Sequence, residues 1–299
     1  MLVIASRGSQ LALWQANWVQ QQLAELGYPS RIEIIRTTGD KITDVPLAQV
    51  GGKGLFTKEI EEALLAGRAD LAVHSLKDLP TELPEGLMLA ATPERQDPRD
   101  AIVGRRLADL PAGAKVGTSS LRRAAQLRKL RPDLEIEAVR GNLDTRLRKL
   151  DAGQYHAIVL AAAGLKRLGW EARIAEVFSA DVMCPAVGQG ALAIETANAD
   201  LLARQACEKL NHPPTQFAVT AERALLGALG GGCQVPIGAY ATVTSGQLQL
   251  MAVVVSPDGR QLVRDRAEGP VADAEQIGRG LGEALLAAGA DQILESVYG

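Results

Sequence analysis

The sequence predicts two α/β domains followed by a smaller α+β domain. Strands alternate with helices from the N-terminus to about residue 210, which is the pattern of α/β units. Two polar, proline-containing segments, 94–100 and 212–215, interrupt the alternation and indicate domain boundaries. After the second of them, three strands follow one another between two helices, which is typical of a small α+β domain. A chain of 299 residues is also longer than one hydrophobic core usually organises.

The first region combines buried strands with amphipathic helices. Residues 2–7 (LVIASR) read as a strand, and Ser9 caps a helix that continues to Leu26, with apolar residues spaced four and three apart. We expect further strands at 31–37, 69–75 and 87–92, and a helix at 55–66. Between these strands and the second boundary, further strands are expected at 101–104, 115–117, 135–140, 156–161 and close after 184–195. Helices are expected at 120–130 and 143–152, in a segment that ends at about residue 169, and at 199–210. The last region contains a helix at 214–228, strands near 237–243, 248–256 and 262–267, and a helix at 272–288.

The composition excludes several classes of protein. Hydrophobic residues make up 47% and charged residues 22%, as in ordinary globular proteins. The longest apolar run, 157–165, is too short to span a bilayer, and the N-terminal strand does not resemble a secretory leader, so we expect a cytoplasmic protein without a membrane partner. The net charge of −3 and an aromatic content of 3% argue against nucleic-acid binding. The three cysteines are far apart and form no CxxC pair, so we expect neither a disulfide framework nor a metal site.

Arginines gather where strands are expected to end. In GTSSLRR, a glycine and hydroxyl residues begin a helix, while Arg122 and Arg123 lie in its first turn, where positive charge opposes the helix dipole unless an anion is bound. The alternative is a solvated basic helix face. Arg140 ends the next strand and Arg146 lies one helical turn beyond it. Because ligands gather at the carboxyl ends of strands in open α/β sheets, these residues favour an anionic small molecule, either as a substrate or as the ligand of a non-catalytic binding protein.

The segment VHSLKD places titratable groups directly after a strand. His74 alternates with Val73, which favours a structural histidine. Asp78 is the candidate for chemistry, because a carboxylate among basic residues can transfer a proton or stabilise a cation. The alternative is an ordinary turn aspartate before Pro80.

The segment LGGGCQVPIG, 229–238, places Cys233 after three glycines, which leave room around its sulfur. Cys184 and Cys207 are interpreted as small core residues. Cys233 has no partner cysteine close in sequence, and the histidines are scattered, so a covalent anchor is favoured over a catalytic nucleophile. The alternative is a tight turn that happens to contain cysteine.

Together these segments resemble the porphobilinogen deaminase family, also called hydroxymethylbilane synthase. The resemblance covers nearly the whole chain in one order, in the segments IASRGSQLALWQA, VGGKGLFTKEIE, VHSLKDLP, ERQDPRDA, GTSSLRR, VRGNLDTRL, AAAGLKRLG, PAVGQGALAIE and GGCQVPIGAYA. It implies two domains like those of periplasmic binding proteins with the active site in the cleft between them, and a third, smaller domain. The implied divisions are 1–95 with 190–211, 96–189, and 212–299.

The resemblance also implies an activity and a cofactor. The family joins four porphobilinogen molecules head to tail, releases ammonia at each step, and hydrolyses the product free as hydroxymethylbilane. The chain grows on a dipyrromethane cofactor, held by a thioether to the residue that corresponds to Cys233. The resemblance favours a monomer, while the absence of a metal and of a nucleic-acid partner is expected from the composition.

By matching motif, the resemblance assigns catalysis to Asp78, which assists loss of the amino group, stabilises the resulting cation and removes a proton after coupling. The residues assigned to cofactor binding, besides Cys233, are Ser75, Lys77, Thr118, Ser119, Arg122, Arg123, Arg140 and Arg146. Those assigned to the substrate are Arg7, Arg173, Gln189, and, in the segment around 39–58 that resembles the family's mobile lid, Lys53 and Phe56. The chain departs from the family at Gly230, where members often carry an acidic residue.

Overall fold

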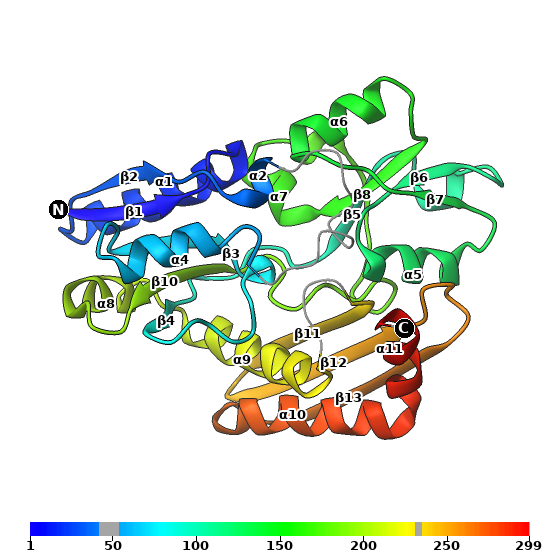
Figure 1. Ribbon diagram of the computed structural model, residues 1–299. Helices are drawn as coiled ribbons and strands as arrows, with labels where there is room; N and C mark the ends of the chain where they lie inside the picture. The colour runs from blue at the N-terminus through cyan, green and yellow to red at the C-terminus, as the bar shows by residue number, and fades with distance from the viewer. Residues whose placement is uncertain (42–53, 231–234, 299) are drawn as a thin grey trace. The chain divides into compact units, whose positions relative to one another are not determined.

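The computed structural model describes residues 1–41, 54–230 and 235–298 (Figure 1). The chain divides into two compact units. The first consists of Met1–Gln96 and Ala191–Gln216, and the second of Asp97–Gly190 and Phe217–Gly299.

The first unit is built on a five-stranded sheet with one antiparallel strand inside it. The strand order is β2-β1-β3-β10-β4, and β10 runs antiparallel to both of its neighbours. Figure 1 shows β3 and β10 side by side in this sheet. The bounds are β1 (Leu2–Ser6), β2 (Ser30–Ile34), β3 (Leu71–Ser75), β4 (Leu87–Ala91) and β10 (Leu192–Ala197), and the helices are α1 (Gln10–Glu25), α2 (Thr38–Lys41), α4 (Lys58–Leu65) and α8 (Leu201–Glu208).

Two cores form on the two faces of this sheet. On one face, Val19 of α1 and Ala203 of α8 pack with Leu71 of β3. On the other face, Ile60 of α4 packs with Ala72, the residue that follows Leu71. Neighbouring residues of one strand therefore bury their side chains in different cores, because side chains alternate between the faces of a sheet.

Helix α1 follows the sequence prediction closely. The Ser9 hydroxyl accepts a hydrogen bond from the N–H of Ala12 at 3.3 Å, and Gly27 follows the helix with a φ of +84°. The predicted apolar positions Ala16, Val19 and Leu23 are buried. The capping serine begins the helix, the apolar spacing buries one face of it, and the glycine follows its end, as the sequence predicted.

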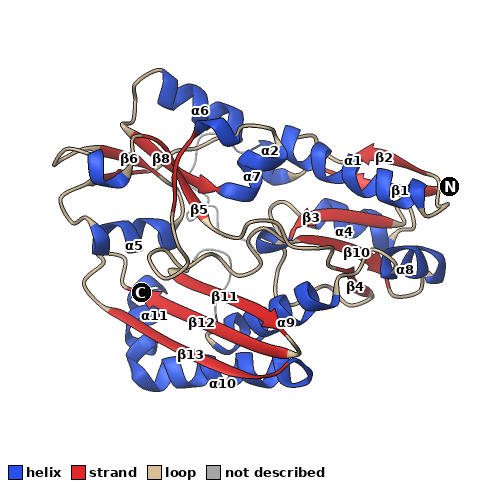
Figure 2. Ribbon diagram, turned by 180° about the vertical axis from the view of Figure 1, so that it is seen from behind, coloured by secondary structure: helices blue, strands red, loops and turns tan. Residues whose placement is uncertain are grey.

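The second unit begins with a sheet of the same topology. The order is β7-β6-β8-β5-β9, with β6, β7 and β8 parallel and β5 antiparallel between β8 and β9. Strands β6, β8 and β5 of this sheet are labelled in Figure 2. The bounds are β5 (Asp100–Gly104), β6 (Lys115–Gly117), β7 (Glu135–Glu137), β8 (Ala157–Ala161) and β9 (Ile174–Val177), and the helices are α5 (Leu121–Leu130), α6 (Leu143–Asp151) and α7 (Ala162–Arg167). Strand β9 was not expected from the sequence.

A third sheet completes the second unit. It is an antiparallel meander of three strands, and α10 packs along β12 and β13. The bounds are β11 (Ile237–Thr244), β12 (Gln247–Val255) and β13 (Leu262–Pro270), with α9 (Pro213–Ala228), α10 (Ala274–Leu285) and α11 (Asp291–Tyr298). The expected fold class, two α/β sheets and a small C-terminal sheet with helices, is confirmed. The third sheet packs against α5 through Ala125, Cys184, Val253 and Val255, which explains why it shares a unit with the second.

None of the described helices is both long enough and apolar enough to cross a membrane.

Gly230 ends helix α9 in the left-handed region of backbone space. Its φ is +63°, and its N–H donates to the carbonyl of Gly227 at 3.0 Å. A residue with a Cβ is strained in this conformation, whereas glycine is not. The backbone therefore accounts for the glycine at the position where family members often carry an acidic residue.

Gly230→Ala is expected to lower the free energy of unfolding by about 1–2 kcal/mol, because alanine must adopt a positive φ. Chemical denaturation measures the change. Gly227→Ala is the matched control: this glycine lies exposed inside α9 with no atom within 4 Å of an added Cβ, and we expect its substitution to stabilise by about 0.5–1 kcal/mol. Equal effects of the two substitutions would contradict this explanation.

Candidate active site

The first part of the candidate site is the turn that follows β3. A single 3₁₀ turn, Leu76–Asp78, begins directly after Ser75, the last residue of the strand. The Ser75 hydroxyl accepts a hydrogen bond from Nε2 of Gln15 at 2.8 Å, and the N–H of Leu76 donates to the carbonyl of Ala191 at 3.0 Å. Asp78 is exposed at the end of this turn. The strand and two flanking hydrogen bonds thus fix the backbone that presents the Asp78 carboxylate.

Two further residues, His74 and Gln15, lie close to this turn. His74 is buried and lies 3.0 Å from a carboxylate oxygen of Glu195, so it is a structural histidine, as predicted. Gln15 was missed. It lies on the buried face of α1, where a polar side chain among apolar neighbours is the available signal of a specific partner.

Arg7 and Phe56, both predicted to bind substrate, lie together in the first unit. The Arg7 guanidinium stacks over the Phe56 ring, 4.1 Å from its centroid, and pairs with the Asp40 carboxylate. Burial alone would raise the pKa of Asp40, but hydrogen bonds from Arg7 and Thr37 hold it below its ordinary value. The planar guanidinium is thus fixed on one face by a ring and on one edge by a carboxylate.

In the second unit, the carboxyl ends of β6 and β7 are joined through backbone and hydroxyl groups. The N–H of Thr118 donates to the carbonyl of Glu137 at 2.8 Å, and the Ser119 hydroxyl donates to the carbonyl of Val139 at 2.7 Å. Ser120 then caps α5. The two predicted hydroxyl residues therefore hold the loops together at this edge of the sheet.

Arg140 and Arg146 lie on the loop and helix after β7. Among the described residues, no carboxylate lies within 4 Å of the Arg140 side chain, and only its carbonyl is bonded, by Nζ of Lys149 at 3.2 Å. Nε of Arg146 donates to the carbonyl of Gly141 at 2.7 Å, which fixes this side chain against the loop. Arg140 is thus a cation of the site whose charge is not balanced by a neighbouring acid.

Arg122 and Arg123 are buried around a single carboxylate, Asp100, which is fully buried. Arg122 Nη1 donates to one Asp100 oxygen at 2.6 Å, and Arg123 Nε donates to the other at 2.8 Å. Burial alone would raise the pKa of Asp100, but the two guanidinium groups hold it well below its usual range. Nε of Arg122 is buried and has no partner in the described part of the chain. The cluster therefore retains one unused donor.

Gln189 and Arg167 extend this buried polar region. Nε2 of Gln189 donates to Asp100 at 2.9 Å, and its Oε1 lies 3.3 Å from Nη2 of Arg123. Arg167 was missed by the sequence analysis. It donates to the carbonyl of Gly190 at 2.7 Å, and burial lowers its pKa to about 10. This buried arginine, which lies within the segment GLKRLG, is a further cation of the second unit.

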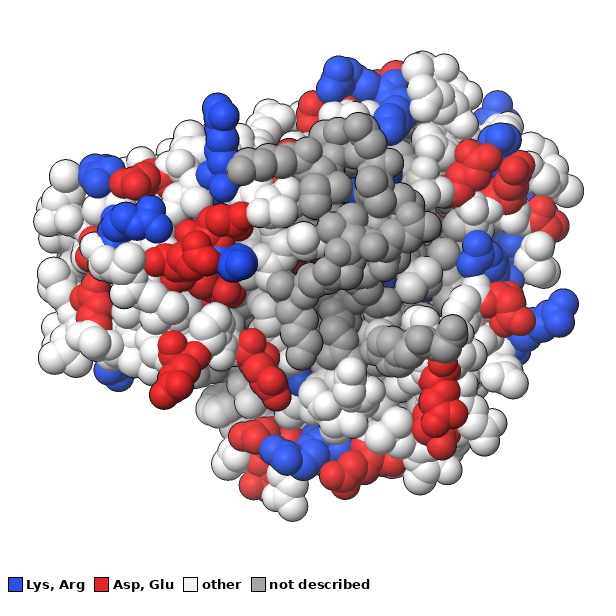
Figure 3. All heavy atoms as spheres, in the orientation of Figure 1, with Lys and Arg blue, Asp and Glu red and all other residues white. Residues whose placement is uncertain are grey.

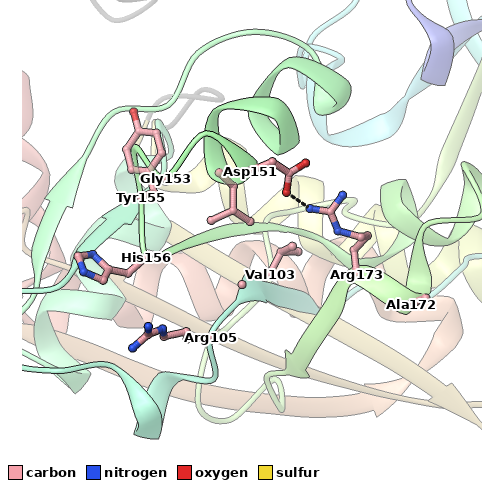
Figure 4. A pocket seen from close by; sticks show the side chains of 10 residues that line it. Val103, Arg105, Asp151, Gly153, Tyr155, His156, Ala172 and Arg173 are labelled. Atoms are coloured by element: carbon pink, nitrogen blue, oxygen red, sulfur yellow. Dashed lines mark hydrogen bonds and ion pairs between the residues drawn. The ribbon is translucent and has the colours of Figure 1, made fainter.

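The structure does not bring Arg173 to the same edge of the sheet as Thr118 and Ser119. Arg173 precedes β9, which runs parallel to β6, so it lies at the amino end of the parallel strands. There it pairs with Asp151 at 2.5 Å and, with Arg105 and His156, lines a cavity of about 500 Å³ (Figure 4).

Cys233 and Lys53 lie outside the described residues. The other two cysteines are buried, and burial raises the pKa of both Cys184 and Cys207 to about 12. These two thiols are therefore protonated and poorly nucleophilic at neutral pH. In the described part of the chain, no three metal-ligating side chains lie close enough together to hold a metal ion.

Comparison with known proteins identifies relatives over the whole length. Residues 2–205 match the family model described as porphobilinogen deaminase, dipyromethane cofactor binding domain, and residues 216–287 match the model of its C-terminal domain. The chain is 55% identical to the porphobilinogen deaminase of Pelobacter propionicus, over 99% of this chain and 97% of the relative. It is 54% identical to that of Geobacter sulfurreducens, over 99% and 95%.

The solved structures that the chain matches are more distant. A periplasmic substrate-binding protein of an ABC transporter from Coxiella burnetii is 12% identical with a TM-score of 0.46, over 75% of this chain and 97% of that one. The methionine-binding protein MetQ is 13% identical with a TM-score of 0.45, over 70% and 89%.

Asp100→Asn is expected to lower the free energy of unfolding by about 3–5 kcal/mol, because two buried guanidinium groups then lose their carboxylate. Since the pKa of Asp100 is depressed by folding, its contribution is present above about pH 4 and is lost as the pH falls further. Urea denaturation at several pH values measures both effects. Asp151→Asn, in the half-exposed pair with Arg173, is the control and should change stability by less than about 1 kcal/mol. A small effect of Asp100→Asn would refute the role of the buried cluster.

Proposed function

The chain belongs to the porphobilinogen deaminase family, and we propose which role each of its site residues has in the reaction of that family. The enzyme is a transferase that condenses four porphobilinogen molecules head to tail on a dipyrromethane primer, releases ammonia at each step, and hydrolyses the product to hydroxymethylbilane for tetrapyrrole and haem biosynthesis. The observation that carries this conclusion is the match of both family models, which together account for most of the chain.

The residues of the second unit fit a group that carries several carboxylates. Arg140 has no acidic partner among the described residues, and Nε of Arg122 is a buried donor without an acceptor. Unused guanidinium donors near helix α5 are the groups that bind acetate and propionate side chains. When bound, the dipyrromethane supplies the pyrrole carbon to which the first substrate is joined. We propose that Cys233 is its covalent anchor, as the family resemblance implies.

Asp78 is the proposed catalytic residue. Its carboxylate is exposed at the end of a turn that β3 and the bond from Leu76 to Ala191 hold in place. From there it can deliver a proton to the leaving amino group, stabilise the cation that the substrate becomes when ammonia departs, and accept a proton after coupling. We propose that one carboxylate serves all three steps, because each of them involves a proton or a positive charge with which a carboxylate interacts favourably.

The remaining proposed residues bind carboxylates or position the loops. We propose that Arg140, Arg146, Arg122 and Arg123 act on the cofactor, where Thr118, Ser119, Ser75 and Lys77 support them. Arg7, stacked on Phe56, is proposed to act on the substrate, together with Lys53, Gln189 and Arg173. Arg7 and Arg140 are supported by their partly accessible guanidinium groups. Gln189 is fully buried, and Arg173 lies at the amino end of the parallel strands, so their positions give no such support.

We further propose a cytoplasmic monomer of three domains, 1–95 with 190–211, 96–189 and 212–299, which acts on a small molecule without nucleic-acid or membrane partners. The three separate sheets support the domain division. The net charge of −3 supports a small-molecule ligand, since nucleic-acid binding requires a basic surface. On the face shown in Figure 3, acidic and basic side chains of the described residues are interspersed.

The purified chain is expected to be heavier than its sequence by the mass of one dipyrrole, and Cys233→Ala should remove the addition. Intact-mass spectrometry measures it. Cys207→Ala is the matched control, since this buried thiol with a pKa raised to about 12 should not matter for the adduct. Loss of the adduct in the control and not in Cys233→Ala would refute the anchor. Failure of the wild-type chain to release ammonia from porphobilinogen would indicate a binding protein instead.

Asp78→Asn is expected to lower kcat by about 10²–10⁴-fold while KM changes little, because the amide cannot transfer the proton or balance the cation. Steady-state ammonia release measures both constants. Asp109→Asn is the control: Asp109 is also the exposed last residue of a 3₁₀ turn, Leu107–Asp109, and its substitution should leave both constants unchanged. Wild-type turnover by Asp78→Asn would exclude the proposed role.

A further inference from the structure

A buried set of titratable side chains lies between α4 and the sheet of the first unit. His74 on β3 and Glu195 on β10 are diagonal neighbours, since His74 is opposite Ala193 and Glu195 is opposite Ala72. His74 Nε2 lies 3.0 Å from Oε2 of Glu195, and the two side chains are 5% and 0% exposed. Glu61 of α4 is buried on the same side. None of these three side chains is used by the proposed reaction.

The three side chains offer more acceptors than donors. A carboxylate only accepts, so Nε2 of His74 donates to Oε2 of Glu195. Oε1 of Glu195 and Oε1 of Glu61 are both buried without a partner in the described part of the chain. Burial raises the pKa of Glu61, and the charge of Glu195 acts in the same direction, while the Thr57 hydroxyl and His74 act against them. Glu61 therefore holds its proton more firmly than a free glutamate does, in line with the cost of burying a charge.

This buried set is connected to the catalytic turn through three residues of backbone. His74 directly precedes Ser75, the last strand residue, and Leu76–Asp78 follows without a linker. The strand β10 that carries Glu195 is continuous with Ala191, whose carbonyl binds the N–H of Leu76. The His74–Glu195 bond therefore joins the two strands whose relative position decides where Asp78 lies. Buried ionic and polar pairs of this kind fix register more than they add stability.

We propose that His74 and Glu195 are positioning residues for Asp78, and that Glu61 completes their buried environment. The proposal rests on the catalytic role proposed for Asp78. The hydrogen bond between the two strands holds the end of β3, and with it the Asp78 carboxylate, at one distance from the reacting carbon. Neither His74 nor Glu195 contacts the substrate.

The test compares Glu195→Gln with wild type in the full-length, cofactor-bound enzyme. Glutamine keeps the shape of the side chain but weakens its bond to His74, so we expect kcat to fall about 10-fold or more while KM stays within about twofold. Glu62→Gln, in the next, exposed position of α4, is the matched control and should change neither constant. A folded Glu195→Gln enzyme with wild-type kcat would overturn the proposal, since a merely structural pair would change only the melting temperature.

Substitutions of His74 keep the proposal testable if Glu195→Gln fails to fold. Glutamine at position 74 can place an N–H donor close to the position of Nε2, whereas leucine cannot. His74→Gln should therefore retain a kcat at least several-fold higher than His74→Leu at similar KM. Equal values of kcat in the two variants would overturn the proposal.

The effect of burial on Glu61 is tested by pH. Because its pKa is raised by folding, the contribution of Glu61 to stability is fully present below its unfolded pKa and is lost as the pH rises through the folded pKa. Glu61→Gln removes this loss, so the melting temperature of the variant minus that of wild type should increase between about pH 5 and pH 8. A difference that does not change with pH would overturn this part of the proposal.

A wild-type enzyme that releases no ammonia would overturn the proposed function, and the positioning role with it. An active wild type with a fully active Glu195→Gln variant would overturn the positioning role alone.

Discussion

In each of the two α/β sheets, one antiparallel strand supplies a buried carboxylate that holds a neighbouring loop of the site. Strand β10 supplies Glu195, which bonds His74 just before the Asp78 turn. Strand β5 supplies Asp100, which binds Arg122 and Arg123 in the first turn of α5. Because each carboxylate sits in a central strand, the loop that it binds takes its position from the most rigid part of the sheet.

The free energy of burying these carboxylates depends on the geometry of their hydrogen bonds. Removing a carboxylate from water costs several kcal/mol, and the interaction with its partners repays this cost only when the hydrogen bonds are well formed. Asp100 meets this condition, since Arg122, Arg123 and Gln189 all donate to it within 3.3 Å. Half-exposed pairs such as Arg173 with Asp151 contribute little, because water screens them.

Local patterns in the sequence predict the elements, whereas the partners of the buried charges come from long-range contacts. Helix α1 was predictable because its cap, spacing and terminal glycine all lie within one segment. Strand β9 was missed because its four residues are only half-buried and give no alternating pattern. Arg122 and Arg123 were interpreted as ligand residues or as part of a solvated basic helix face, since Asp100 lies 22 residues away from Arg122 and nothing nearby points to it. His74 is separated from Glu195 by 121 residues, and the sequence predicted its burial but not its partner.

The arginines of the second unit therefore fall into two groups that contribute differently to ligand binding. Arg122 and Arg123 share the charge of Asp100, so their attraction for a distant anion is reduced, although Nε of Arg122 still offers a directional hydrogen bond. Arg140 has no such acid among the described residues and keeps its full charge. In the proposed ligand site, long-range attraction thus depends on Arg140, and short-range orientation depends on the arginines that Asp100 binds. A ligand is attracted mainly by the charges that lie near it. A chain with a net charge of −3 can therefore still present a basic site to a ligand rich in carboxylates.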